Sequence, residues 1–81
     1  MKNPQGVKAF GQHLRILRET RGLSQQELAD IANVEKSTIK RIELATYSPT
    51  LDVLISVCRA LKMTMSDLMD NTSITELDNG M

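Results

Sequence analysis

Residues 22–43 constrain the fold of this chain more than any other stretch, because they encode two short helices separated by a tight turn. Ser24 and Glu27 form a capping box, in which each side chain can satisfy a backbone N–H at the start of a helix. The residues that follow give this helix an apolar face at 3.6-residue spacing: Leu28, Ile31 and Ala32. Residues 33–34 interrupt the pattern. A first short helix is therefore expected over residues 24–32.

A second short helix is expected over residues 35–44. Ile39 and Ile42 lie three residues apart and set its apolar stripe. The side chains left on its outer faces are polar or basic: Lys36, Ser37, Lys40 and Arg41. The two short helices and their turn form a helix-turn-helix whose outer face is basic.

A longer helix is expected before this motif, over residues 7–21. Its core face consists of Phe10, Leu14 and Leu17. Gly22 follows as a left-handed stop, a conformation that glycine adopts without steric cost.

Two more helices are expected after the motif. Pro49 and Thr50 read as a stop followed by a new N-cap, so a helix should span residues 51–61. Thr64 and Asp67 repeat the capping-box spacing and predict a fifth helix. The sequence thus predicts an all-α fold, a compact five-helix bundle over residues 7–70, flanked by a polar N-terminal arm (residues 1–6) and a flexible C-terminal tail (residues 71–81).

Size and composition limit what such a bundle can do. A chain of 81 residues makes one domain at most and buries a modest core, so association with a partner is plausible. Cys58 is the only cysteine and cannot form an internal disulfide; its place in a helical pattern favours a buried small hydrophobe. No apolar run is long enough to cross a membrane, and no hydrophobic signal region follows the polar N-terminus. We therefore expect no membrane partner and a reducing, cytoplasmic location.

The net charge is zero, but the charges are unevenly distributed. Residues 1–49 hold eight basic and five acidic side chains, whereas residues 50–81 hold two basic and five acidic ones. Since the basic half carries the helix-turn-helix, a neutral chain can still present a positive face to nucleic acid.

The chain resembles the Cro and phage-repressor family of DNA-binding domains, also called the xenobiotic-response-element class, over roughly residues 7 to 70. The matching positions run in order through the chain: Arg18, Leu23-Ser24-Gln25, Glu27-Leu28-Ala29, Val34, Ser37-Thr38-Ile39, Ile42-Glu43, Pro49-Thr50-Leu51 and Ala60-Leu61. The resemblance implies a lambda-repressor-like bundle in which the second and third helices form the helix-turn-helix. One departure lies after Glu43, where the family often has a polar residue and glycine but this chain has Leu44 and Ala45.

The resemblance also implies roles for individual residues. Base edges would be read by Lys36, Ser37 and Arg41, since the N-terminal half of a recognition helix enters the major groove. Phosphate contacts are expected from Gln25, Thr38, Lys40, Thr46 and Tyr47. Arg18 and Glu43 resemble a pair that joins the first helix to the end of the third, and we expect a partly buried ion pair there.

A homodimer is expected through the fifth helix. If Leu68 and Met63 turn inward, Met65 and Met69 point outward on one face, where a monomer gains nothing from them. Members of the family often dimerise through this last helix, which places two recognition helices about 34 Å apart, one turn of B-DNA.

The function expected from these features is a sequence-specific, homodimeric repressor or autoregulator that binds double-stranded DNA at an inverted repeat. The alternative is an antitoxin-like module in which the fold binds a partner protein and DNA contact is secondary. An enzyme is not expected, because the chain has one histidine, one cysteine, no phosphate-binding glycine loop and no metal-ligand spacing. No cofactor, metal or small-molecule substrate is expected.

Overall fold

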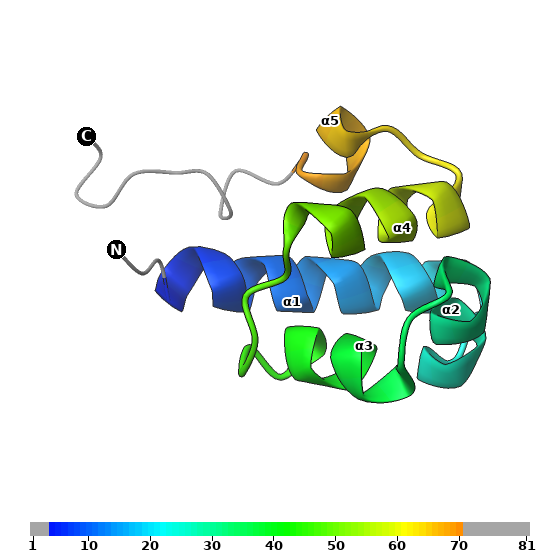
Figure 1. Cartoon of the computed structure of the whole chain (residues 1–81). Coiled ribbons are helices and arrows are strands. Elements are labelled where there is room, and N and C mark those ends of the chain that lie inside the picture. Colours follow the sequence, from blue (N-terminus) through cyan, green and yellow to red (C-terminus); the bar gives the residue numbers. More distant parts are fainter. Residues whose placement is uncertain (1–3, 71–81) are drawn as a thin grey trace.

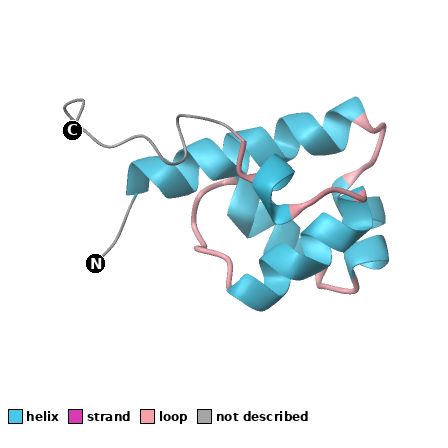
Figure 2. Cartoon of the chain, turned by 90° about the horizontal axis from the view of Figure 1, so that it is seen from above, coloured by secondary structure: helices cyan, strands magenta, loops and turns pink. Residues whose placement is uncertain are grey.

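The computed structural model describes residues 4–70, and every regular element within that range is a helix (Figures 1 and 2). The predicted all-α class is confirmed. The predicted tail at residues 71–81 lies outside the described residues. The helices are α1 (Pro4–Thr20), α2 (Gln25–Ala32), α3 (Lys36–Glu43), α4 (Leu51–Leu61) and α5 (Met65–Leu68). No helix in residues 4–70 is long and apolar enough to cross a membrane.

Helix α1 starts earlier than the sequence pattern indicated. It begins at Pro4, so residues 4–6 of the predicted N-terminal arm belong to the helix. Proline suits a first helical position because its missing N–H would have no intrahelical partner there. At the other end Gly22 adopts φ 69°, as predicted, and the N–H of Leu23 reaches back 3.1 Å to the carbonyl of Arg18. This left-handed closure stops α1 and turns the chain towards α2.

The core lies where the five helices meet, and every helix contributes to it. Helix α3 packs against α1 and α2, while α4 packs against α2 and α5. Figure 1 shows α3 at the bottom edge of the bundle and α5 at the top, with α1 and α4 between them. The buried residues of the core cluster are Phe10, Leu14, Leu28, Ala29, Ile39, Ile42, Val57, Cys58, Leu61 and Leu68. The helix-turn-helix is thus held from behind by α1 and α4.

The predicted apolar face of α2 is wrong at Ile31, whose surface is 57% exposed. The helix buries Ala29 instead, together with Leu28 and Ala32. With about 100° per residue, these three residues define one arc, and Ile31 lies roughly 110° from its centre. Ala29 has a small side chain that fits on the buried face of α2, which packs against α3 and α4. Tertiary packing thus decides which face of α2 is buried.

Gly11 allows α1 and α3 to approach closely. A Cβ atom at this position would clash with the carbonyl oxygen of Ile42 and lie 3.1 Å from that of Glu43. Both carbonyls belong to the last turn of α3, so any larger residue would displace that helix.

Candidate nucleic-acid interface

Helix α3 separates its side chains into a buried and an exposed set. Ile39 and Ile42 are buried, which fixes the rotation of the helix about its axis. The outer face consists of exposed side chains: Lys36, Ser37, Lys40 and Arg41. Within residues 4–70 none of these four side chains forms a hydrogen bond or an ion pair. The donors of the three cationic groups are therefore available to an external anion or acceptor.

The chemistry of this outer face suits duplex DNA. The planar guanidinium of Arg41 can donate two parallel hydrogen bonds to guanine N7 and O6, and the Lys36 ammonium can donate to the same acceptors. The Ser37 hydroxyl can donate or accept. Thr38 is half-buried at the flank of the face, so less of its side chain is open to a phosphate.

The turn between α2 and α3 sets the angle of this face. Asn33 caps α2 in the left-handed conformation, with φ 59°, and the N–H of Val34 bonds the carbonyl of Ala29 at 3.0 Å. Asparagine tolerates this conformation better than other residues with a side chain. The turn is therefore closed by local backbone hydrogen bonds and does not depend on the side chains of α3.

The N-terminus of α2 carries the predicted capping box. The Ser24 hydroxyl accepts from the N–H of Glu27 at 3.0 Å, and the Glu27 carboxylate accepts from the N–H of Ser24 at 2.8 Å. The backbone N–H and the hydroxyl of Ser24 lower the pKa of Glu27 by stabilising its charged form. Both contacts fix the first turn of α2, which begins at Gln25.

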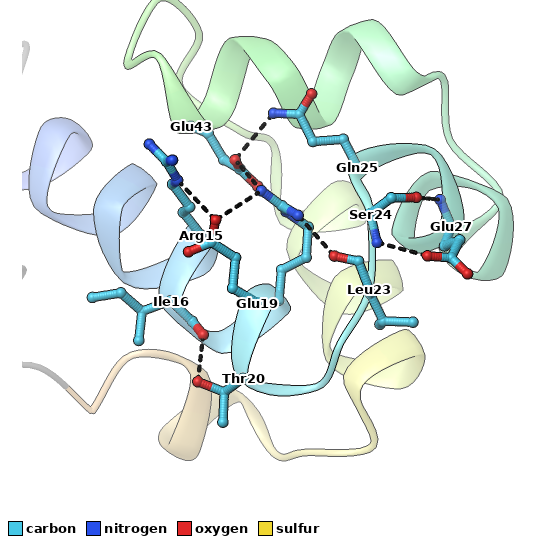
Figure 3. A network of polar contacts seen from close by, with 10 residues as sticks. Arg15, Ile16, Glu19, Thr20, Leu23, Ser24, Gln25, Glu27 and Glu43 are labelled. Atoms are coloured by element: carbon cyan, nitrogen blue, oxygen red, sulfur yellow. Dashed lines mark hydrogen bonds and ion pairs between the residues drawn. The ribbon is translucent and has the colours of Figure 1, made fainter.

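Arg18 and Glu43 lie in contact inside the bundle, with their side chains only 10% and 4% exposed. The guanidinium Nε donates to Glu43 Oε2 at 2.7 Å, and Nη2 donates to Oε1 at 3.1 Å. Nη1 donates to the carbonyl of Leu23 at 2.7 Å. Figure 3 shows these contacts crossing from α1 to the end of α3 and to the chain before α2. The hydrogen bond with Glu43 raises the pKa of Arg18, so this buried group stays charged.

Gln25, predicted to contact phosphate, belongs to the same network. Its side-chain Nε2 donates to Glu43 Oε1 at 3.1 Å (Figure 3). The residue is half-buried, so part of its surface is still open to solvent. The sequence did not indicate this contact, because the two residues are 18 positions apart and only the packing of α3 on α2 brings them together.

The loop after α3 takes a path that glycine would favour. Ala45 adopts φ 61°, and the N–H of Thr46 bonds the carbonyl of Arg41 at 2.9 Å. The Thr46 hydroxyl also donates to that carbonyl, at 3.3 Å. Tyr47 is half-buried and packs against the core. Of the two predicted phosphate ligands in this loop, Thr46 is exposed and Tyr47 only partly so.

The expectation that Met65 and Met69 point outward is wrong in part. Both side chains are half-buried and pack against the core, and Met65 Sδ lies 4.0 Å from Cys58 Sγ. Helix α5 is a single turn, with Leu68 fully buried beneath it. Met65 therefore faces Cys58 of α4, while Met69 packs against the core. The large apolar residues nearest in sequence that are exposed are Leu51 and Ile55 on α4.

The sequence analysis missed one residue and one contact that shape the interface. Gly11 sets the distance between α1 and α3, and a glycine inside a helical pattern is the signal that could have identified it. The contact of Glu43 with Gln25 had no sequence signal.

Comparison with known proteins agrees with this geometry. Residues 9–70 match the family described as "Helix-turn-helix domain". The chain is 33% identical over 64 residues to the immunity repressor protein of Bacillus phage phi105, covering 79% of this chain but only 44% of the phage repressor. It is 35% identical over 55 residues to the uncharacterized HTH-type transcriptional regulator YgzD of Bacillus subtilis (strain 168), covering 68% of this chain and 83% of that protein.

Two solved structures share the fold. The restriction-modification controller protein C.AhdI from Aeromonas hydrophila superposes with a TM-score of 0.74 at 31% identity, covering 76% of this chain and 94% of its own. The clp gene regulator ClgR from C. glutamicum superposes with a TM-score of 0.74 at 28% identity, covering 83% and 87%. The chain therefore belongs to the helix-turn-helix family of Cro- and repressor-type DNA-binding transcriptional regulators.

Proposed function

We propose that the protein is a homodimeric repressor or autoregulator that places α3 in the major groove of an inverted-repeat operator. The observation that carries this proposal is the outer face of α3, where Lys36, Ser37 and Arg41 are exposed and form no side-chain hydrogen bond or ion pair within residues 4–70. The similarity to a phage immunity repressor and to a restriction-modification controller protein supports a repressor or autoregulator.

The roles within the interface follow from the side-chain chemistry. Arg41 and Lys36 donate to guanine edges, and Ser37 adds an adaptable hydroxyl. Lys40, at the edge of the face, contacts phosphate, as do Gln25 and the half-buried Thr38. These phosphate contacts fix the register of the protein on the duplex, while the base contacts carry the sequence preference.

Selection of bound sequences from a random DNA pool tests sequence-specific recognition. We expect an enriched inverted repeat, with half-sites about one helical turn apart. Enrichment of no sequence, or of a single unrepeated half-site, would contradict the proposed operator geometry.

Substitutions then separate base readout from phosphate contact on the selected operator. Arg41→Ala and Lys36→Ala should each weaken specific binding by about 1 to 3 kcal/mol and relax the preference at particular base pairs. Lys40→Ala should weaken binding to all sequences alike and lower the salt dependence by about one phosphate contact. Arg59→Ala is the matched control, since it removes an exposed positive charge from α4. If Arg41→Ala keeps wild-type discrimination between operator and scrambled DNA, α3 is not the reading helix.

A two-fold dimer through α5 would place two copies of α3 on one side of the duplex. The support is the modest core of a short chain and the part of Met65 and Met69 that remains exposed. Sedimentation at micromolar concentration tests this: the wild type should be a dimer, and Met65→Gln with Met69→Gln should be a folded monomer. Leu51→Gln, on the exposed surface of α4, is the control. If only the Leu51 variant loses the dimer, the interface lies on α4 and not on α5.

A further inference from the structure

The carboxylate of Glu43 is shared between the ion pair and the proposed phosphate ligand. Its Oε1 accepts hydrogen bonds from Arg18 Nη2 and from Gln25 Nε2, both at 3.1 Å. Its Oε2 accepts from Arg18 Nε at 2.7 Å. With 4% of its side chain exposed, Glu43 does not itself reach a DNA backbone.

This arrangement determines which atoms of Gln25 are left for a ligand. A carboxylate only accepts hydrogen bonds, so the amide nitrogen of Gln25 must face it and the amide cannot be flipped. Nε2 carries two hydrogens, and the contact with Glu43 uses one of them. The second N–H remains on the half-exposed side chain, at the first residue of α2, where the unpaired backbone N–H groups of the helix also favour an anion.

We infer that Glu43 is a positioning residue for DNA binding, which holds the amide of Gln25 so that its second N–H donates to a backbone phosphate. This inference rests on the proposed DNA-binding function. Glutamine is among the side chains that lose most rotamer freedom when ordered, and Glu43 imposes that order before DNA arrives. Arg18 is the other half of the arrangement, because its guanidinium neutralises a carboxylate that would otherwise repel the phosphate.

A double-mutant cycle on operator affinity tests the inference at a temperature where circular dichroism shows every variant folded. In the wild type, Gln25→Ala should weaken binding about tenfold, as expected for a lost hydrogen bond to a charged group. In the Glu43→Gln background the same substitution should weaken binding by less than about twofold, because the single acceptor oxygen of the new amide is uncharged and is also needed by Arg18, so it holds the Gln25 amide far less firmly.

Val57→Ala provides the matched control, since it destabilises the core from α4 without touching the network. In that background Gln25→Ala should keep its full effect. A full effect in the Glu43→Gln background as well would overturn the inference while leaving the proposed function intact. Wild-type protein that binds no DNA would overturn the proposed function and the inference together, and DNA binding unaffected by Gln25→Ala would overturn the phosphate contact.

A measurement on the unsubstituted protein covers the case in which Glu43→Gln does not fold. Side-chain ¹⁵N relaxation of the free protein should show the Gln25 amide to be much more ordered than that of Gln12, which is exposed on α1. Equal mobility of the two amides would overturn the inference.

Discussion

The Arg18–Glu43 pair should be worth far more to stability than a surface ion pair. Exposed pairs contribute about 0 to 1 kcal/mol, because water competes and two long side chains must be ordered. Here the side chains are 10% and 4% exposed and share two hydrogen bonds, so removing one partner leaves a buried charge behind. Such a loss costs about 3 to 5 kcal/mol. A domain of this size has about 4 to 12 kcal/mol of stability in total, so either single substitution should remove a large part of it.

The two single substitutions should differ in a way that the contacts predict. Glu43→Ala leaves Arg18 with the carbonyl of Leu23 and, at 4.0 Å, the exposed carboxylate of Glu19, whereas Arg18→Ala leaves Glu43 with the amide of Gln25. In both cases the buried opposite charge is lost, and the exposed Glu19 replaces it only weakly for Arg18. The double variant should therefore cost much less than the sum of the two single variants.

Urea unfolding of the wild type, both single variants and the double variant gives the coupling free energy directly. We expect about 2 to 3 kcal/mol, the upper part of the range for residues in one network. Arg15→Ala is the control, because its contact with Glu19 is exposed and should contribute below about 0.5 kcal/mol. A coupling energy near zero for Arg18 and Glu43 would refute the reasoning, since it would mean that neither charge is stranded.

Three further predictions concern backbone and titration. Ala45→Gly should stabilise the protein by about 1 kcal/mol in urea unfolding, because glycine adopts φ 61° without the steric cost paid by alanine; a loss of stability would contradict this. Gly11→Ala should destabilise by about 1 to 3 kcal/mol and weaken operator binding, because α3 must move away from the clash with Ile42; unchanged melting and binding would show that the helices yield without cost. The pKa of Glu27 is lower in the folded state than its ordinary value of 4.5. The stability that the charged carboxylate adds is therefore fully present above pH 4.5 and is lost as the pH falls through the folded-state pKa. The free energy of unfolding of Glu27→Gln should accordingly depend less on pH in the acid range than that of the wild type. Identical pH profiles would show that Glu27 adds no such stability.

Much of the fold follows from local signals in the sequence. The side chains of Ser24, Thr50 and Thr64, each predicted as an N-cap, accept from the backbone N–H three residues ahead. These contacts form within one helical turn, so the residues concerned are close in sequence. The stop at Gly22 is likewise local. The basic face of α3 could be predicted for the same reason, because the position of Ile39 in the helical period determines which neighbours point outward.

Contacts between distant residues could not be read from the pattern. Helical spacing allowed Ile31 to be part of the core, and only the packing of α2 on α3 and α4 selected Ala29 in its place. The outward direction predicted for Met65 is wrong in part, because α5 lies close enough to α4 for contact with Cys58 and the residue is half-buried.

The polar network of Arg18, Gln25 and Glu43 shows most clearly the difference between local signals and contacts that depend on tertiary packing. The sequence by itself placed Gln25 in the first turn of α2 and Glu43 in the last turn of α3, since capping and periodicity act over a few residues. Whether the two side chains meet depends on the angle at which α3 leaves the turn and on how closely Gly11 lets it approach α1. Only the tertiary structure decided that Gln25 faces a carboxylate, because that contact requires α3 to pack on α2, and Arg18 of α1 holds the same carboxylate from the other side.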